Sequence, residues 1–278
     1  MQDIAPRQAE EIIEALSDIA SRASAATLAV PFSAVEHRTK DDLSPVTAAD
    51  EASEAIILEG LARLCPGVPV VAEESVAQGK LPDRIDGSFF LVDPLDGTKE
   101  FLAGRDEYTV NIALVTRGTP VAGVITAPAQ GLLWRGVVGG KAERLTLKFG
   151  EPAAQASERH LIHARPWPPQ LRAGTSRSHL DDRTKDFMAQ LPIGEQYMCG
   201  SSVKFCHIAE GGADIYPRLS PTCEWDIAAG CAILAAAGGR TTAPDGSALI
   251  FGNRSAKFLV PGFIAVGDAT QKFAFPGR

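Results

Sequence analysis

Two aspartates, Asp93 and Asp96, lie three positions apart, and a glycine and a hydroxyl follow them in the run Asp-Pro-Leu-Asp-Gly-Thr. Carboxylates this close repel each other unless a cation lies between them or one keeps its proton. Their oxygens are hard ligands that suit Mg²⁺, and the backbone N–H groups around Gly97 and Thr98 could cradle an anion. The run therefore indicates metal-dependent phosphate chemistry. Asp-Pro and Asp-Gly pairs are also common in turns, so an ordinary turn is an equal alternative for this stretch alone.

An apolar stretch directly before these acids would position them. Residues 88–92 read Ser-Phe-Phe-Leu-Val and predict a buried strand. Pro94 lacks an N–H group and fixes its own φ, so we expect the strand to end there. Both acids would then lie at the end of a rigid element, which can hold them in place.

Further acids follow two other predicted elements. Residues 68–72 predict a short strand that ends at Glu73 and Glu74, and Asp226 lies in the first turn of an apolar helix predicted from 225 to 239. A solvated loop explains the two glutamates, and the helix dipole explains Asp226. Because a buried acid needs a partner, the alternative is that Asp226 is a third acid aimed at a metal.

The N-terminal half shows helical spacing in two places and strand patterns in several. Residues 6–27 predict an amphipathic helix. Thr47 and Asp50 form a variant capping box before a second helix, which explains Asp50 without catalysis. A short strand (35–39), a polar loop (40–45), three sheet strands (108–116, 120–127 and 132–138) and a turn (117–119) complete this half.

A polar, alanine-rich stretch from about 148 to 158 predicts a crossover between two parts of the chain. We expect an N-terminal α+β part, 1–155, with most of the metal ligands, and a C-terminal α/β part, 156–278, with Asp226. In the second part, the hydroxyl-rich run 175–179 could hold phosphate or ribose oxygens, or equally cap a helix from about 181 to 190. A helix within 200–211 should place Lys204 on its solvated face, and strands are expected at 213–218 and 258–266.

The amino-acid composition limits the classes of protein to which the chain can belong. The 278 residues are 45% hydrophobic and 22% charged, which is an ordinary composition for a soluble protein. The net charge of -7 argues against a general nucleic-acid binder. The five cysteines show no Cys-x-x-Cys pair and predict reduced thiols in a cytoplasmic protein. No signal peptide or membrane-spanning run is apparent, and no zinc-hydrolase, Walker or nucleophile-elbow motif appears. A homodimer is the base-rate expectation.

Four motifs stand in a fixed order: Ser-Pro-Val-Thr-x-x-Asp ending at Asp50, Glu73–Glu74, the run from Asp93 to Thr98, and Trp-Asp-x-Ala-Ala-Gly around Asp226. Together they resemble the lithium-sensitive, magnesium-dependent phosphomonoesterase superfamily that includes the inositol monophosphatases, and the likeness covers nearly the whole chain. Within it, the chain is most similar to the CysQ-type 3'(2'),5'-bisphosphate nucleotidases. That likeness rests on residues 99–101, 175–179, 200–206, 215–218 and 221–222.

The resemblance implies a layered α-β-α-β-α sandwich and a role for each matching position. Glu73, Asp93 and the Leu95 carbonyl would hold one Mg²⁺, Asp93, Asp96 and Asp226 a second, and Glu73 could reach a third. Thr98 with Glu73 would orient and deprotonate the attacking water, and Asp50 with a flap around Lys40 would support the loosely held ion. The substrate-binding residues would be Glu73, Leu95, Asp96, Gly97, Thr98, Ser176, Lys204, Arg218 and Asp226.

The implied reaction is hydrolysis of the 3'-phosphate of adenosine 3',5'-bisphosphate to AMP and phosphate, in sulfur assimilation and nucleotide recycling. The implied location is the cytoplasm, or the cytoplasmic face of the inner membrane as in similar proteins. The alternative is an inositol or sugar-phosphate phosphatase with the same metals. A non-catalytic metal or phosphate sensor on the same fold would be expected to lack a metal ligand or Thr98. The chain retains Thr98 and all four acidic ligands, Glu73, Asp93, Asp96 and Asp226. Val260 and Ile227 depart from the usual pattern beside the site and leave the substrate preference open.

Overall fold

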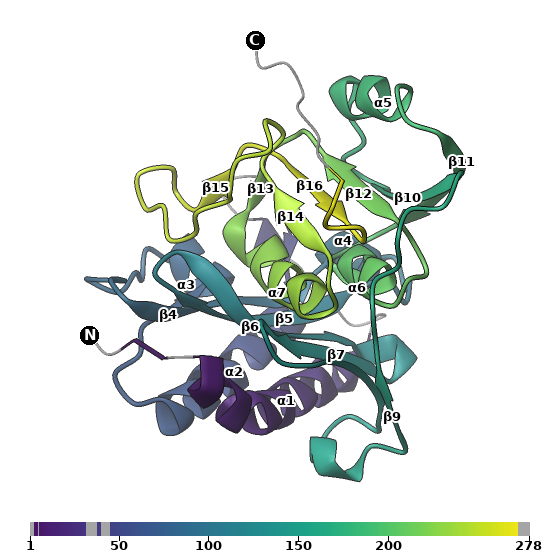
Figure 1. Cartoon of the computed structure of the whole chain (residues 1–278). Helices are drawn as coiled ribbons and strands as arrows, with labels where there is room; N and C mark the ends of the chain where they lie inside the picture. The colour runs from purple at the N-terminus through teal and green to yellow at the C-terminus, as the bar shows by residue number, and fades with distance from the viewer. Residues whose placement is uncertain (1–2, 5, 32–37, 40–44, 272–278) are drawn as a thin grey trace.

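The structure is a computed structural model that describes residues 3–4, 6–31, 38–39 and 45–271. The two large sheets alternate with layers of helices, so the predicted α-β-α-β-α sandwich is confirmed (Figure 1). Helices α1 (Pro6–Ala29) and α2 (Ala48–Leu64) cover the outer face of the first sheet. Helices α6 (Val203–Ala209) and α7 (Glu224–Ala236) lie between the sheets, and α5 (Asp182–Met188) covers the second.

The first sheet has the strand order β3-β4-β5-β6-β7-β8-β9. Neighbouring strands are antiparallel except for the parallel pair β3 and β4. Arg117 and Gly118, with φ values of 50° and 77°, make the predicted tight turn between β5 and β6. The strands are β3 (Val70–Ala72), β4 (Ser88–Asp96), β5 (Thr109–Thr116), β6 (Thr119–Ala127), β7 (Leu132–Val137), β8 (Ala142–Thr146) and β9 (Glu158–Leu161).

Strand β4 does not end at Pro94, and that prediction was wrong. Asp93 pairs with Asn111 and Asp96 pairs with Thr109, so β4 has one residue more than β5 across this interval. This bulge accommodates the proline, which has no N–H to give to the ladder. Both aspartates are therefore held by strand pairing on either side of the bulge.

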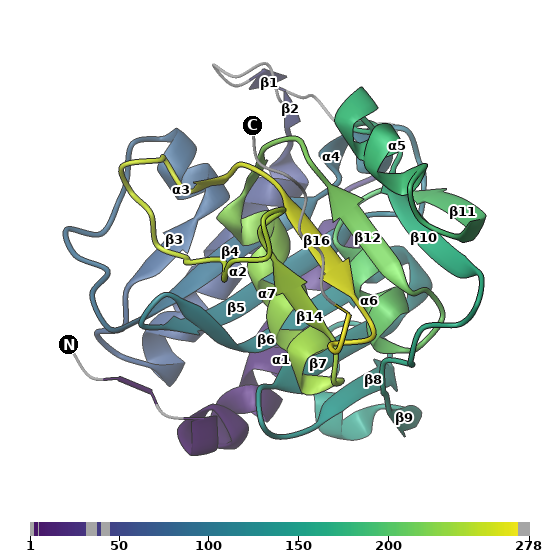
Figure 2. The same cartoon turned by 45° about the horizontal axis from the view of Figure 1, so that its top comes forward.

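The second sheet has the order β11-β10-β12-β16-β14 and lies over α7 (Figure 2). The predicted last strand is divided, because β15 pairs with β13 whereas β16 pairs with β12 and β14. Pro261 and Gly262 separate the two pieces. The strands are β10 (Leu171–Ser176), β11 (Ile193–Cys199), β12 (Ile215–Arg218), β13 (Thr222–Cys223), β14 (Arg240–Thr242), β15 (Leu259–Val260) and β16 (Phe263–Val266).

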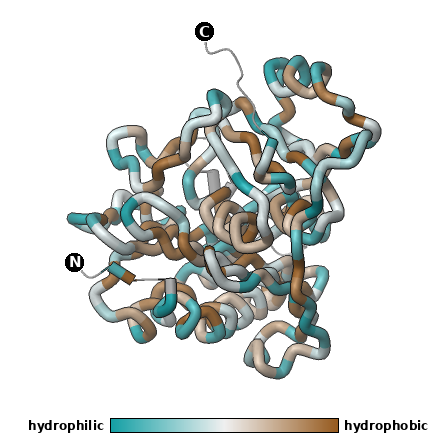
Figure 3. The backbone as a smooth tube through the Cα atoms, in the orientation of Figure 1, coloured by the Kyte–Doolittle hydropathy of each residue, from teal (hydrophilic) through white to brown (hydrophobic). Residues whose placement is uncertain are grey.

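The hydrophobic core follows the layers. One cluster joins α1 and α2 to the first sheet, a second surrounds α6 and α7 between the sheets, and a third lies under α5. Apolar segments accordingly concentrate in the strands and in the central helices (Figure 3). The five cysteines are all free thiols, as expected. None of the described helices combines the length and hydrophobicity that a bilayer span requires.

The connection at residues 148–158 stays within the first sheet, so the predicted crossover there was wrong. It holds the short 3-10 helix η3 (Ala153–Gln155), and β9 then pairs antiparallel with β8. The division of the chain at residue 155 stays a prediction. Most of the predicted strand 35–39 and loop 40–45, including the flap around Lys40, lies outside the described residues; the flanking pieces are β1 (Arg38–Thr39) and β2 (Pro45–Val46).

The remaining short helices also contact the strands or extend them. These are α3 (Glu73–Ala77), which follows β3 directly, α4 (Thr98–Leu102), which follows β4, and η2 (Pro128–Gln130), between β6 and β7. The predicted solvated loop at Glu73 is therefore a helix start. Glu74 is buried, whereas a residue of a solvated loop would be exposed.

Candidate active site

One cavity of about 460 Å³ brings the predicted residues together. Residues from β4, from the starts of α3, α4 and α7, and from the ends of β10 and β12 line it. All predicted metal-binding and substrate-binding residues are among them: Glu73, Asp93, Leu95, Asp96, Gly97, Thr98, Ser176, Lys204, Arg218 and Asp226. Asp50 is not part of the lining and lies behind Thr98, 2% exposed.

Parallel pairing of β3 and β4 sets Glu73 beside Asp93. Ala72 pairs with Val92, so the next residue of each strand lies at the same level of the sheet. Asp96 follows after the bulge in β4, and Asp226 comes from the first turn of α7.

The acids perturb one another electrostatically. Removal from water raises the pKa of Asp96 above its ordinary value, and the charge of Asp226 raises it further, while Lys204 opposes the shift. Removal from water and the charge of Glu73 likewise raise the pKa of Asp226. Such a group of acids is costly to assemble without a compensating cation.

The chemistry of the donor set fits a hard divalent cation. Five carboxylates and the Leu95 carbonyl line the cavity, and four of these acids, Glu73, Asp93, Asp96 and Asp226, are the predicted metal ligands. Oxygen donors are what Mg²⁺ prefers. Backbone N–H groups orient two of the carboxylates: Leu95 donates to Asp93 Oδ1 at 3.0 Å, and Cys223 donates to Asp226 Oδ2 at 3.1 Å. Among the described residues, no three acidic, histidine or cysteine side chains converge closely enough to enclose an ion in the observed arrangement.

Thr98 and Asp50 form a contact that the sequence left undecided. The predicted capping box is confirmed, because Asp50 Oδ2 accepts from the Thr47 N–H at 2.8 Å and from the Thr47 hydroxyl at 2.6 Å. The other oxygen, Oδ1, lies 3.3 Å from Thr98 Oγ1, which is also 3.2 Å from the Leu95 carbonyl. Capping and contact with Thr98 thus use different oxygens of one carboxylate.

Gly97 turns the chain from β4 into α4. Its φ is 95°, a left-handed conformation that side chains rarely adopt. A Cβ there would lie 3.1 Å from the Glu107 carbonyl oxygen. The glycine therefore allows the backbone to pass close to residue 107 before Thr98 begins the helix.

Lys204 is not on a solvated face, and that prediction was wrong. It is 1% exposed, and its ammonium donates to the carbonyl oxygens of Cys199, Gly200 and Ser201 at 3.0, 3.0 and 2.5 Å. The ammonium also lies 4.9 Å from the centroid of the Tyr216 ring. These groups replace water around the charge, which helical periodicity alone does not reveal.

Arg218 adds positive charge to the cavity, and His179 lines it as well. Arg218 donates through Nη2 to the Pro221 carbonyl at 2.9 Å, while its buried Nε has no hydrogen-bond partner among the described residues. Burial lowers the pKa of His179, and the charges of Arg218, Lys99 and Lys204 lower it further. An anion bound here would meet several cationic groups and an unused donor.

Sequence reasoning missed the residues that support the site from behind. Ser202 donates to Asn111 at 2.7 Å and shares a hydrogen bond of 2.8 Å with Thr109, which itself reaches Asp96 at 3.5 Å. Glu54 and Glu107 are further supporting residues, described below. Their partners lie far away in the chain, so no local motif could have identified them.

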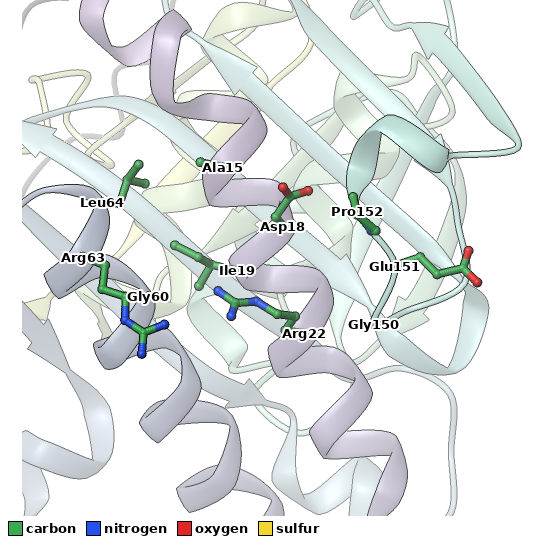
Figure 4. A pocket seen from close by; sticks show the side chains of 10 residues that line it. All are labelled: Ala15, Asp18, Ile19, Arg22, Gly60, Arg63, Leu64, Gly150, Glu151 and Pro152. Carbon is green, nitrogen blue, oxygen red and sulfur yellow. The ribbon is translucent and has the colours of Figure 1, made fainter.

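A second cavity, of about 390 Å³, lies between α1, α2 and the 150–152 segment (Figure 4). Arg22 and Arg63 line it together with Asp18 and Glu151, over an apolar floor. Asp18 already accepts the Ala153 N–H at 2.7 Å. Its lining has two acids and no serine or threonine, whereas the first cavity has five acids and several hydroxyl groups, and we therefore take the first as the candidate active site.

Comparison with known proteins places the chain in a family. A profile described as the inositol monophosphatase family matches residues 8–268. The 3'(2'),5'-bisphosphate nucleotidase CysQ of Salmonella typhimurium is 42% identical over 229 residues, which cover 82% of this chain and 88% of that protein. The protein of the same name from Escherichia coli K12 is 41% identical over 225 residues, covering 81% and 86%.

Solved structures show the same architecture. The crystal structure of CysQ from Bacteroides thetaiotaomicron is 32% identical with a TM-score of 0.75, covering 94% of this chain and 98% of that one. An inositol monophosphatase from Anabaena is 26% identical with a TM-score of 0.72, covering 94% and 92%. Motifs, cavity, fold and relatives agree, and the chain belongs to the inositol monophosphatase family, a family of metal-dependent phosphatases.

Proposed function

We propose that this protein is a 3'(2'),5'-bisphosphate nucleotidase that hydrolyses the 3'-phosphate of adenosine 3',5'-bisphosphate to AMP and phosphate. The observation that carries the proposal is the identity of 41–42%, over four fifths of the chain, to proteins named for this activity. The cavity supports it, because acids that suit a metal and cationic groups that suit a second phosphate line the same space.

The proposed cofactor is Mg²⁺, with two or three ions held by Glu73, Asp93, the Leu95 carbonyl, Asp96 and Asp226. When bound, Mg²⁺ supplies Lewis-acid stabilisation of the negative charge on the phosphoryl oxygens and favours ionisation of water. The mutual repulsion of the acids and their oxygen-only chemistry support this assignment.

The chain's own residues would handle the proton and the orientation of the phosphate. Thr98 Oγ1 is close enough to Asp50 to donate its proton there, which leaves its lone pairs to accept a proton from the attacking water. Glu73 would orient that water. As the water oxygen bonds to phosphorus, the bond between phosphorus and the ribose 3'-oxygen breaks. The leaving 3'-oxygen takes a proton from solvent water and becomes the 3'-hydroxyl of AMP. The N–H groups of Gly97 and Thr98 would hold a phosphate oxygen.

The substrate choice depends on Ser176, Lys204 and Arg218, together with Lys99 and His179 beside them in the lining. An inositol monophosphate carries a single phosphate group, and that group would be bound by the metals. The unused Nε of Arg218 and the neighbouring cations would then have no anionic partner. The nucleotide's 5'-phosphate would provide one, which favours it over the alternative.

The test is phosphate release from adenosine 3',5'-bisphosphate and from inositol 1-phosphate, side by side, with Mg²⁺ and with or without lithium. We expect strong preference for the nucleotide and inhibition by lithium. Preference for inositol 1-phosphate would keep the metal site and overturn the substrate. No release from either, with Mg²⁺ still bound, would favour the sensor hypothesis.

A further inference from the structure

Glu54 of α2 is a buried carboxylate, 6% exposed, that forms no ion pair with an arginine or lysine among the described residues. Its two oxygens point at the start of α3 instead. Oε2 accepts the backbone N–H of Glu74 at 2.9 Å, and Oε1 accepts the Ser75 hydroxyl at 2.7 Å. A carboxyl group in the interior thus holds the first turn of α3 through one backbone N–H and one side-chain hydroxyl.

That turn lacks a cap of its own. Helix α3 begins at Glu73, and the residue in the capping position is Ala72, whose side chain cannot accept a hydrogen bond. The first N–H groups of a helix have no partner inside the helix and need one outside it. Glu54 provides it from a different helix, and so fixes the backbone directly after the metal-ligand candidate Glu73.

The neighbouring residue supports the other group of ligands. Ser53 is fully buried, and its hydroxyl donates to the Pro94 carbonyl at 2.8 Å. Pro94 lies in the bulge between Asp93 and Asp96. Consecutive residues of one long helix therefore hold the two segments that carry Glu73 and Asp93.

We infer that Glu54 is a positioning residue for the metal site: it caps α3 from α2 and so holds Glu73 at the distance from Asp93 that a shared cation requires, while Ser53 fixes the opposite segment. The inference rests on the metal site of the proposed function. It does not depend on the identity of the phosphorylated substrate.

The experiment compares Glu54→Ala, Glu54→Gln and Ser53→Ala with wild type by calorimetric titration of Mn²⁺ in the absence of substrate. Loss of a residue that orients a metal ligand typically weakens binding by about 10–100-fold, and we expect a loss in this range for Glu54→Ala. Glu54→Gln keeps the size of the side chain and one acceptor, so a smaller loss is expected. Glu59→Gln, an exposed glutamate on the same helix, is the matched control and should bind Mn²⁺ as wild type does.

Two further readouts separate positioning from general destabilisation. Hydrogen exchange at the Glu74 and Ser75 amides should accelerate in Glu54→Ala. The Mg²⁺ concentration for half-maximal phosphatase activity should rise in parallel with the Mn²⁺ dissociation constant, and excess Mg²⁺ should restore kcat. A variant that merely unfolds more easily would have a lower Tm with an unchanged Mg²⁺ requirement.

Wild-type Mn²⁺ affinity in folded Glu54→Ala and Glu54→Gln would overturn the inference. If Glu54→Ala does not fold, Glu54→Gln decides alone. Failure of wild-type protein to hydrolyse adenosine 3',5'-bisphosphate would refute the proposed function instead. The substrate-free Mn²⁺ titration would still test Glu54.

Discussion

At the scale of single residues, the site is a group of acids held in place by hydrogen-bond donors that also belong to the cavity lining. Asp226 accepts the Cys223 N–H and the hydroxyl of Thr222, and Asp93 accepts the Leu95 N–H. These bonds fix the direction of each carboxylate and favour its charged form. They do not remove the repulsion between the acids, which leaves the cavity ready for a cation.

Asp96→Asn should abolish turnover without unfolding the protein. Asparagine has nearly the same shape but lacks the charge, so a loss of several kcal/mol of transition-state stabilisation is expected, at least ~10²-fold in kcat. Removal of one charge from mutually repelling acids should leave the urea midpoint of the metal-free protein at or above that of wild type. Asp86→Asn, at an exposed site, is the control. Near-normal kcat in Asp96→Asn would contradict the assignment.

Lys204→Met tests whether the buried ammonium organises its loop. The substitution leaves three carbonyl groups without their cation, and we expect a loss of about 3 kcal/mol in the free energy of unfolding. Urea unfolding measures this, with Lys185→Met as an exposed control. Wild-type stability combined with lost AMP binding would instead identify Lys204 as a substrate ligand alone.

At the scale of elements, α7 connects the core to the site. It is buried between the two sheets, and its first turn carries Asp226. Contact with β6 is close because Gly123 has no side chain: a Cβ there would lie 2.4 Å from the Ala229 carbonyl oxygen. The position of Asp226 therefore depends on a glycine in a strand on the opposite side of the interface.

Gly123→Ala should displace α7 and impair both stability and metal binding. The added methyl group meets helix backbone, which cannot rotate away, so we expect a cost of about 3 kcal/mol, at the upper end for overpacking. Thermal unfolding and Mn²⁺ titration are the measurements. Gly212→Ala is the control, because its Cβ would approach the His207 carbonyl oxygen no closer than 3.3 Å. An unchanged Tm in Gly123→Ala would show that the helix adapts freely.

At the scale of the whole molecule, strands of both large sheets contribute residues to the cavity lining, and Glu107 joins the two sides. It lies between α4 and β5, and its carboxylate accepts from Arg177 Nη2 at 2.6 Å, from Arg177 Nε at 3.2 Å and from the Gly200 N–H at 2.8 Å. Arg177 stands between the lining residues Ser176 and Ser178. One side chain thus holds two segments of the cavity lining, the run from Ser176 to Ser178 and the segment at Gly200.

Glu107→Gln should lower stability at neutral pH by about 1–2 kcal/mol, because the charge-assisted bonds to Arg177 are weakened. Burial raises the pKa of Glu107, but the hydrogen bonds from Arg177 and Gly200 and the charge of Arg177 outweigh it, so the net shift is downward. A lowered pKa in the folded state means that the carboxylate stabilises fully above its unfolded pKa and loses this effect as the pH falls through the folded value.

The difference in unfolding free energy between wild type and Glu107→Gln should therefore be greatest near pH 7. It should shrink as the pH falls below the ordinary glutamate pKa of about 4.3 and on through the lowered folded-state pKa, where the wild-type carboxyl takes up its proton. Urea unfolding at several pH values measures it. Glu195→Gln, which removes an exposed partner of Arg172, should have little effect at any pH. A gap that does not change with pH would show that the charge of Glu107 is not what stabilises the fold.

The sequence by itself determined the features that depend on neighbours along the chain. Apolar patterns predicted most strands of the first sheet. Thr47 and Asp50 predicted their capping box, because its two residues are three positions apart. The spacing of Asp93, Asp96 and Thr98 indicated the metal chemistry. Strands with weaker apolar patterns, such as the exposed β9, escaped prediction. The oligomeric state and cellular location stay predictions.

Only the tertiary structure decided which side chains are withdrawn from water and which partners they find there. Lys204 is buried because its own loop folds back to present three carbonyl groups, and β4 runs past Pro94 because β5 pairs with it on both sides of the bulge. Glu54 and Glu107 matter because backbone from distant segments meets their carboxylates. Desolvation and hydrogen bonding are set by groups that approach through space, so residue order alone does not encode them locally.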